Sequence, residues 1–525
     1  MVQVLHGVLK EYIRTHDEYT KLYGEQTVVL IEVGSFYELY SVVNDEMNVG
    51  PDLYALSSLV NLSVTRKNKN ISEISPSNSL MMGVPSIAYQ KYRDMFLDNG
   101  YTVVKMDQIT EPPNIERQVV EVCSPGTTID YNSSRDTNYL VSIYIGVYPT
   151  NQEKLYCVGL SAIDISTGTN YVSSVQSSMK DTNKWTDEIF RFIHNYNPRE
   201  IIVHFDVSDF QVDTSNLCNE WNISEKNTHW NILWNKEYES ISYQNDYYRK
   251  LYDTTGYLSP LECIGFETSP DVALSHIYMM EFIHIHKVEN IKECKRPIHL
   301  EEMNHLSLSY NCMYQLYVIH TSEHSSESYN SLMSLLNRCK TPMGRRLCKQ
   351  RILHPIVDPT TLQERYEMIE SFQKDTIDSQ STYLYDTMIR NLTKIIDIER
   401  GFRKMSVGSL CPCEFFNAHQ SYHYINELFK HLHVDYPSFL QHYKDVETGL
   451  SDYVKHYSSL FIVENMASAD MKNMNRSIFH TDIYPEIDTM SCKINSRVTL
   501  LQQITDKLGF YIDKQKTGVV KLSYT

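Results

Sequence analysis

The chain has 525 residues, and its 48 Lys and Arg stand against 65 Asp and Glu, which gives a formal net charge of −17. This acidic balance excludes a wholesale basic coat for DNA or RNA, so any nucleic-acid site must be a local feature. The length predicts three or four domains. No run of 18 apolar residues offers a membrane span, and residues 1–19 lack the uninterrupted apolar stretch of a signal peptide. We therefore expect a soluble, intracellular chain that is not secreted and has no membrane segment.

In chain order, the first predicted element that bears on function is a strand over residues 27–40, because its side chains alternate. One face takes the core residues Val29, Ile31, Val33, Tyr37 and Leu39. The opposite face takes Glu32, Gly34, Phe36, Glu38 and Tyr40. An aromatic ring and a carboxylate two residues apart then point outward past a glycine, and such a face invites a ligand.

The outward residues of this strand have a chemistry that suits a distorted DNA duplex. A protruding Phe36 can wedge between base steps at a cost of about a few kcal/mol per step, and weakened steps yield most easily. The Glu38 carboxylate accepts hydrogen bonds only from a base donor or a protonated group, so it can discriminate between bases. Gly34 has no side chain, so it permits a ligand to approach the strand closely. The simpler interpretation is that Phe36 and Glu38 lie on a half-covered strand, under a loop or helix.

The elements after residue 66 predict an α/β region followed by a helical one. Residues 67–79 form a polar loop, and the break at 111–114 places a boundary near residue 115. Strands are predicted over 139–147, 155–165 and 200–205, with a helix over 187–194. After residue 257, helical stripes are formed by Val272, His276, Met279, Met280 and Ile283, by Leu332, Leu335 and Leu336, and, on one long helix, by Met388, Leu392, Ile395 and Phe402. A helix over 497–508 and a strand-like run over 518–524 end the chain.

At Gly34-Ser35-Phe36-Tyr37-Glu38 the sequence resembles the N-terminal domain of the MutS family of DNA mismatch-recognition proteins, whose mark is a Gly-x-Phe-Tyr-Glu motif. The resemblance continues in order through residues 62–67, 82–85, 100–104, 116–120, 124–127, 164–168, 341–347, 353–356, 364–365 and 397–400. A five-residue motif alone is a weak signal, but ordered matches from Gly34 to Arg400 make coincidence a poor explanation.

The resemblance implies a multidomain chain of α/β and α classes. It implies a mixed α/β mismatch-binding domain over 1–115, a ribonuclease-H-like α/β connector over 116–255, a long-helix lever domain over 256–450 and a partial clamp over 451–525. The acidic balance also resembles the divergent branch of the family found in large DNA viruses and some mitochondria. Nucleus, mitochondrion and viral factory all stay open as compartments.

The resemblance also implies roles for individual residues. In the family the Phe of the motif stacks at the mispaired base and the Glu hydrogen-bonds to it, so Phe36 and Glu38 take these roles, beside Gly34. Candidates for contacts with the DNA backbone are Arg66, Lys67 and Lys69 in the loop, and Lys472, Arg476 and Lys493 in the clamp-like region. For each of these six, an exposed and solvated side chain is the alternative. The implied partner is mismatched double-stranded DNA.

The resemblance also implies an ATPase domain in the family. The phosphate-binding loop GxxxxGK[ST] of such a domain does not occur in this sequence. We therefore expect no enzyme activity, no catalytic residue and no cofactor for this chain as given. ATP and Mg²⁺, a dimer, and a downstream repair protein bound through the connector are implied for the full-length family. The alternative function is an interaction scaffold or DNA-binding remnant that partners a separate ATPase chain.

Three other groups of residues have simple interpretations. His419 and His423 are four apart on a predicted helix, but no third metal ligand is evident, so we expect a helix-surface pair. Cys411 and Cys413 flank a proline turn, and none of the eleven cysteines has the CxxC spacing of a zinc site, so we expect reduced thiols and no metal. Asp164 alone does not make the carboxylate cluster that a nuclease of the ribonuclease-H type needs.

Overall fold

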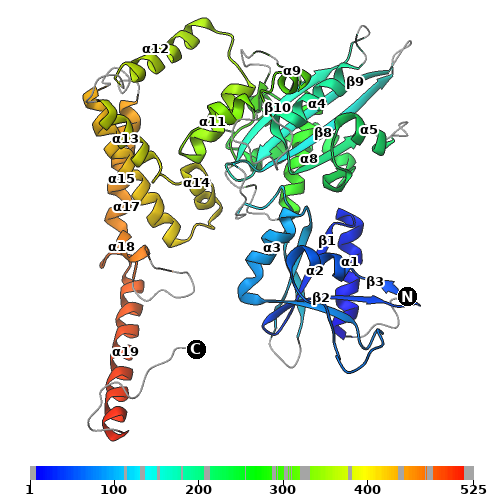
Figure 1. Cartoon of the computed structure of the whole chain (residues 1–525), viewed down its shortest axis with the longest axis vertical. Coiled ribbons are helices and arrows are strands. Elements are labelled where there is room, and N and C mark those ends of the chain that lie inside the picture. The colour runs from blue at the N-terminus through cyan, green and yellow to red at the C-terminus, as the bar shows by residue number, and fades with distance from the viewer. Residues whose placement is uncertain are drawn as a thin grey trace. The chain divides into compact units, whose positions relative to one another are not determined.

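Figure 1 shows the computed structural model of the chain. It describes residues 7–45, 47–110, 115–129, 136–149, 154–178, 181, 183–205, 213–254, 256–286, 291, 294–300, 306, 308, 310–319, 331–375, 381–435, 443–467, 469 and 477–512. The chain divides into two compact units, Met1–Ile369 with Phe402–Ser409, and Glu370–Gly401 with Leu410–Thr525. None of the helices in the described ranges is long and apolar enough to cross a membrane. The predicted mixture of α/β and helical regions is confirmed.

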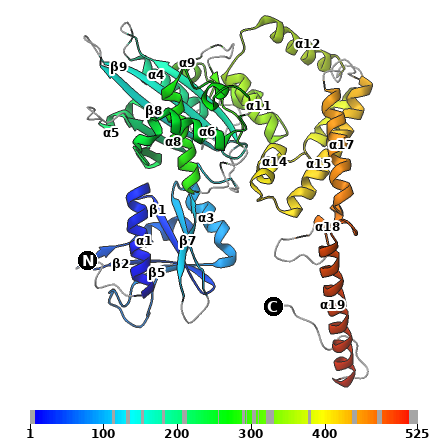
Figure 2. The ribbon, with the colours of Figure 1, turned by 180° about the vertical axis from the view of Figure 1, so that it is seen from behind.

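The first sheet is mixed, because β1 pairs antiparallel with β2 and parallel with β6. Over the described residues its strand order is β4-β5-β2-β1-β6-β7, with β3 paired to β2. Helices cover both faces, which is why the neighbouring residues Leu30 and Ile31 are both fully buried. The elements are α1 (Gly7–Tyr23), β1 (Thr27–Val33), β2 (Phe36–Val43), β3 (Asn48–Val49), α2 (Leu53–Val60), β4 (Thr65–Arg66), β5 (Leu80–Pro85), η2 (Ser86–Ala88), α3 (Tyr89–Asp98), β6 (Thr102–Gln108) and β7 (Arg117–Cys123), seen from behind in Figure 2.

The prediction of one strand over 27–40 is wrong, because the chain reverses at Gly34 and Ser35. Val33 pairs with Phe36 across a two-residue turn, and Gly34 has a φ of +63°. A glycine with positive φ at the first turn position is typical of a type II′ hairpin. Paired residues share a face, so Phe36 and the residues two and four after it lie together as predicted. Glu32, predicted with them, lies on the other face with Tyr37.

The second sheet belongs to the same compact unit. Its order over the described residues is β12-β11-β8-β9-β10-β13, with β8, β9 and β10 antiparallel and β11 parallel to β8. The three strands and the helix predicted between 139 and 205 are confirmed. The elements are β8 (Tyr139–Pro149), β9 (Lys154–Asp164), β10 (Thr169–Gln176), α4 (Lys184–Tyr196), β11 (Glu200–Phe205), α5 (Thr214–Trp221), η3 (Glu225–Asn227), β12 (Thr228–Trp230), η4 (Lys236–Glu239), α6 (Ile241–Leu251), α7 (Pro260–Ile264), α8 (Pro270–His286) and β13 (Ile298–His299).

Helix α8 contains the predicted stripe from Val272 to Ile283 and lies directly on the second sheet. A Cβ atom on Gly159 of β9 would stand only 1.9 Å from the backbone oxygen of Asp271. The absence of a side chain at Gly159 therefore lets helix and sheet meet backbone to backbone. Thirteen of the 17 residues of α8 are buried, which explains why it is apolar nearly all round.

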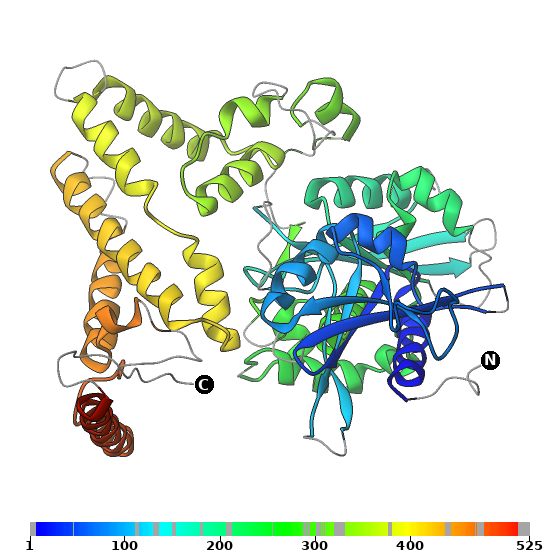
Figure 3. The same cartoon turned by 60° about the horizontal axis from the view of Figure 1, so that its bottom comes forward.

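The rest of the described chain is helical. The elements are α9 (Tyr310–Gln315), α10 (Leu332–Leu336), α11 (Pro342–Leu353), α12 (Pro359–Asp375), α13 (Ser381–Leu392), α14 (Ile398–Val407), α15 (Pro412–Asp435), α17 (Lys444–Leu460), α18 (Val463–Met466) and α19 (Pro485–Ile512). Figure 3 gives a third view of these helices and the two sheets. The helix predicted over 497–508 is confirmed within α19, whereas the strand-like run 518–524 lies outside the described residues.

The long helix predicted through Met388 and Phe402 is wrong, because it is broken between α13 and α14. The backbone N–H of Ile396 donates to the Ser421 hydroxyl at 3.1 Å, and the Asp397 side chain accepts from the N–H of Arg400 at 3.3 Å. Ile395 is 7% exposed in the break. The apolar spacing of a helix continues through the break because Ile395 is buried there too. Asp397 then begins a new helix, α14.

Candidate nucleic-acid interface

Phe36 begins strand β2 immediately after the hairpin turn. The residue is 44% exposed, and a Cβ atom on Gly83 of β5 would stand 3.8 Å from its Cδ1 atom. The N–H of Ser86 donates to the carbonyl of Ser35 at 3.0 Å, which ties the turn to the end of β5. The predicted exposure of the ring is thus observed, on a strand that is held from both sides. A wedge needs an exposed ring on a rigid support.

Gly34 supports this geometry through the backbone. Its positive φ is a conformation in which residues with a side chain are strained, and the reversal of the chain depends on it. The sequence predicts that Gly34 permits close approach of a ligand, whereas the structure gives it a direct role in the turn that places Phe36.

Glu38 lies two residues after Phe36 on the same face and is half-buried. Its cross-strand partners are Ile31 on β1 and Gly83 on β5. Since Gly83 has no side chain, the surface beside both Phe36 and Glu38 is left open. One carboxylate oxygen, Oε2, accepts a hydrogen bond from the hydroxyl of Tyr40.

The reverse face of β2 anchors the strand. Tyr37 is 5% exposed, and its hydroxyl donates to Asp107 Oδ1 at 2.7 Å. Lys105 pairs with Asp107 at 2.7 Å and places its Nζ 5.1 Å from the ring centroid of Tyr89, whose ring in turn contacts Tyr37. Burial, then the bond to Asp107, raises the pKa of Tyr37, so its hydroxyl stays a donor. Tyr37, the tyrosine of the motif, is therefore a buried residue that packs in the core.

The predicted basic loop after β4 is ordered by hydrogen bonds. Asn78 is 2% exposed and its side chain bonds to the backbone of Asn68, Ile71 and Glu73. Arg66 is half-buried and donates from Nη1 to the carbonyl of Ser72 at 2.8 Å. The other two residues of this loop that are predicted to contact the DNA backbone are more exposed than Arg66.

Lys67 and Lys69 are exposed on this loop, so they are the better placed of the three for a phosphate. Phe36 pairs with Pro85 at one end of β5, whereas Lys67 bonds through its N–H to the carbonyl of Ser79 at the other end. The six residue steps from Ser79 to Pro85 correspond to about 20 Å. The backbone positions that hold the ring and the basic loop are therefore about six base-pair rises apart.

Of the three basic residues predicted in the clamp-like region, the structure describes one. Lys493 is exposed on α19, in the second compact unit. Lys472 and Arg476 lie outside the described residues.

The residues with other interpretations have local partners. His419 Nδ1 lies 2.6 Å from the Tyr457 hydroxyl, whereas His423 is exposed on the same helix. Asp164 accepts from the N–H and the hydroxyl of Ser166, at 3.0 and 2.6 Å, so its carboxylate closes its own turn. Within the part of the chain that the structure describes, no three His, Cys, Asp or Glu residues are grouped to hold a metal ion.

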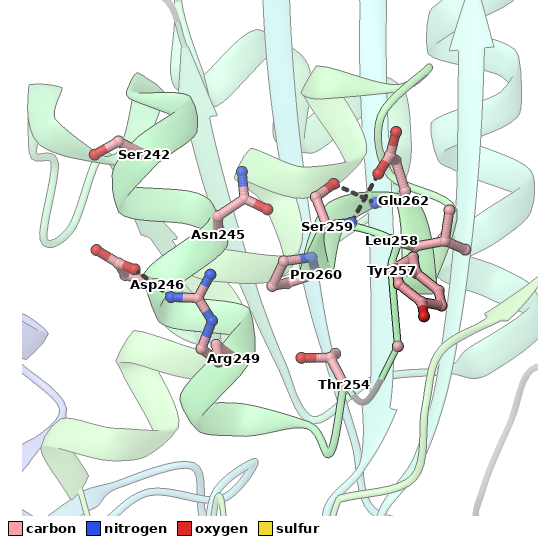
Figure 4. A pocket seen from close by; sticks show the side chains of 11 residues that line it. Ser242, Asn245, Asp246, Arg249, Thr254, Tyr257, Leu258, Ser259, Pro260 and Glu262 are labelled. Carbon is pink, nitrogen blue, oxygen red and sulfur yellow. Dashed lines mark hydrogen bonds and ion pairs between the residues drawn. The ribbon is translucent and has the colours of Figure 1, made fainter.

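A depression of about 640 Å³ lies between α6 and the segment that leads into α7 (Figure 4). Its charged walls are already bonded: Arg249 pairs with Asp246 at 2.9 Å, and Glu262 accepts from the N–H of Ser259 at 2.7 Å. Exposed Tyr257 and Leu258 form its rim. These bonds stabilise the helix ends, and they engage the charged side chains that a ligand would otherwise contact.

Sequence reasoning missed a buried junction between the two sheets. The Glu200 carboxylate, 2% exposed, accepts from Ser124 Oγ at 2.5 Å and from the N–H of Gly126 at 2.7 Å, and lies 3.1 Å from His229 Nε2. Burial raises the pKa of Glu200, but the bond and charge of His229, then those of its other neighbours, outweigh it and lower the pKa. The residues of the run from Ser124 to Thr127 carry no signal for a partner carboxylate far along the chain.

Comparison with known proteins adds three consecutive matches to models of one family. Residues 9–132 match MutS domain I, residues 138–264 match MutS domain II, and residues 311–507 match MutS domain III.

Individual relatives agree with these matches. A putative DNA mismatch repair protein of Acanthamoeba polyphaga mimivirus, a MutS homolog, is 28% identical over 543 aligned residues, which cover 97% of this chain and 46% of the relative. The DNA mismatch repair protein MutS of Streptococcus thermophilus is 26% identical over 391 residues, 73% of this chain and 38% of the relative. That of Petrotoga mobilis is 23% identical over 416 residues, 78% and 43% respectively. The chain thus spans less than half the length of these relatives.

Proposed function

The chain belongs to the MutS family of DNA mismatch-repair proteins, and from this premise we propose that its first sheet recognises mispaired or unpaired bases in duplex DNA. One observation above all supports the proposal. The exposed ring of Phe36 stands at the end of a fixed hairpin, with the Glu38 carboxylate two residues further on the same face and a glycine beside both.

In the proposed mechanism, recognition depends on the cost of deforming the duplex. Phe36 enters between base steps and unstacks them, and a mispaired step opens and bends at a lower free-energy cost than a paired one. The preference for mismatches then comes from this difference, and little of it from the surrounding sequence. Glu38 accepts a hydrogen bond from an N–H group of the base that the ring displaces.

Lys67 and Lys69 are proposed to contact phosphates of the same duplex. Their loop is ordered, so little conformational entropy is lost when they bind. Such contacts position the duplex and carry no sequence information.

Replacing Phe36 by alanine tests the proposal directly. We expect Phe36→Ala to abolish the preference for a mismatched over a perfectly paired oligonucleotide, while weak affinity for duplex remains. The lost stacking corresponds to about 1–3 kcal/mol. Binding of the whole chain to both duplexes, measured by fluorescence anisotropy, gives the preference.

Tyr54→Ala is the matched control, because Tyr54 is an aromatic residue of the same domain that is 61% exposed on α2. It should keep the preference. If Phe36→Ala prefers mismatches as strongly as the unaltered chain, the assignment of the hairpin is wrong. Duplex binding without any preference in the unaltered chain would favour the alternative, an interaction scaffold or DNA-binding remnant.

Further properties of the family are proposed for a longer assembly and rest on the family alone. They comprise a dimer, a downstream repair protein bound through a ribonuclease-H-like connector, and mismatch binding coupled to ATP with Mg²⁺. The sequence has no GxxxxGK[ST] loop to hold a nucleotide, so we assign no nucleotide step to these residues.

The division into mismatch-binding domain, connector, lever and partial clamp is likewise a proposal. The packing of α8 against β9 favours counting α8 with the connector, although its sequence lies within the range proposed for the lever.

A further inference from the structure

Tyr40 follows Glu38 by two residues on β2, and its hydroxyl donates to Glu38 Oε2. The residue is only 7% exposed. Its ring packs edge-on against Tyr12 of α1, with centroids 5.6 Å apart and planes at 79°. The hydroxyl is therefore supported by helix and sheet together, whereas the carboxylate that it contacts reaches toward the surface.

The hydrogen bond determines which end of Glu38 is free. A tyrosine hydroxyl has one proton, and an ionised carboxylate can only accept. Oε2 already accepts that proton, so Oε1 is the oxygen better able to accept a hydrogen bond from a ligand. A glutamate side chain that is already held in place loses less rotamer freedom when a base binds than a free one does.

Burial, together with the neighbouring Glu38, keeps the hydroxyl of Tyr40 protonated. Burial raises the pKa of Tyr40 most, the bond to Glu38 and its charge raise it further, and Arg117 lowers it. Arg117 is itself held, with Nη1 3.4 Å from Glu11 Oε2 and Nε donating to the carbonyl of Glu32 at 2.9 Å. The balance leaves Tyr40 as a donor.

We propose that Tyr40 is a positioning residue for mismatch discrimination: its hydroxyl fixes Glu38 with one oxygen occupied and the other presented as an acceptor beside Phe36. The inference rests on the proposed function, because it assigns to Tyr40 the orientation of the group that contacts the base. The ligand it favours is a displaced base that offers an N–H donor.

A double-mutant cycle in the full chain tests this inference. Tyr40→Phe removes the hydroxyl and keeps the ring against Tyr12, so the fold is retained. We expect it to lower the mismatch-over-paired binding ratio about tenfold, the effect of one hydrogen bond to a charged group. In the Glu38→Ala background the same change should lower the ratio by less than about twofold, because nothing remains to be positioned.

Tyr101→Phe is the control for loss of a hydroxyl, since Tyr101 is a half-buried tyrosine of the same domain before β6. It should leave the ratio unchanged. Equal losses from Tyr40→Phe in both backgrounds would mean a purely structural role and overturn the inference. An unchanged ratio in Tyr40→Phe, together with its loss in Phe36→Ala, would overturn the role of Tyr40 and leave the proposed function standing. An unchanged ratio in Phe36→Ala and Glu38→Ala alike would overturn both.

Discussion

Phe36 and Glu38 contribute differently to the proposed interface. The ring acts through stacking, which every base can satisfy, so it favours any weakened step. The carboxylate acts through a directional bond and can therefore rank one mismatch against another. Its short distance from the ring, two residues along one strand face, restricts both effects to the same base or its neighbour.

Glu38→Gln separates these contributions. The amide keeps the size of the side chain but adds two donors, so it can bond to base acceptors that the carboxylate repels. We expect the order of affinities among the single-base mismatches to change, while the overall preference over paired duplex persists through Phe36. A panel of oligonucleotides with each mismatch, titrated under one salt condition, measures the order. The same order in both proteins would count against a base contact by Glu38.

At the residue scale, the placing of Phe36 and Glu38 on one face of a strand could be predicted from the sequence. The hydrogen bonds of the residues around them could not. Phe36 and Glu38 were identified by alternation and by the motif. Tyr40 was placed on the right face, but its bond to Glu38 depends on side-chain rotamers that no spacing encodes. The phosphate contact of Arg66 stays a prediction, and the bond from its Nη1 to the carbonyl of Ser72 is one that no spacing encodes.

The elements show a similar division. Strands β8, β9 and β11 of the second sheet and helix α4 were predicted correctly because their apolar runs are bounded by polar breaks, whereas β10, β12 and β13 were not predicted. The hairpin at Gly34 was missed because both faces of β1 are buried, so the apolar pattern does not show that the alternation shifts by one residue across the two-residue turn. The break before α14 was missed because Ile395 keeps the apolar spacing of a helix, while the backbone N–H of the next residue, Ile396, donates to the Ser421 hydroxyl.

The close contact between β9 and α8 gives an element-scale prediction. In Gly159→Ala the new Cβ would meet the backbone of Asp271, and a backbone cannot rotate away as a side chain does. We expect a loss of about 3 kcal/mol, seen as a lower midpoint of the first thermal transition. Calorimetry of the whole chain measures it.

Gly449→Ala is the control, because Gly449 lies within the exposed part of α17 and its Cβ would meet no described atom within 4 Å. Alanine favours a helix by about 0.5–1 kcal/mol over glycine, so this variant should be as stable or more stable. If Gly159→Ala melts like the unaltered chain, the helix does not approach the sheet as closely as described.

At the scale of the whole molecule, a chain of net charge −17 is proposed to bind a polyanion. Favourable contacts must then come from a few local cations against a repulsive average field. The exposed pair Lys67 and Lys69, on a loop next to the first sheet, is such a local feature.

Salt dependence measures this contribution. Affinity for duplex should fall as KCl rises, since each phosphate contact releases condensed counterions. Replacing Lys67 or Lys69 by glutamine should reduce the slope of log affinity against log salt by about one unit each, for paired and mismatched duplex alike. Lys184→Gln, at an exposed lysine that begins α4, should leave the slope unchanged. An unaltered slope in the double variant of Lys67 and Lys69 would exclude them as phosphate contacts.

The buried junction at Glu200 determines how small a folding fragment can be. Residues of the first sheet, Leu140 of β8 and Phe282 of α8 share one hydrophobic cluster, and the Ser124 hydroxyl and Gly126 N–H find their acceptor on β11. A fragment that ended at the matched limit of the first domain, residue 132, would expose Tyr23 and leave these donors without their acceptor. We therefore expect the smallest fragment that folds on its own to comprise both sheets with α8, including the hairpin that carries Phe36.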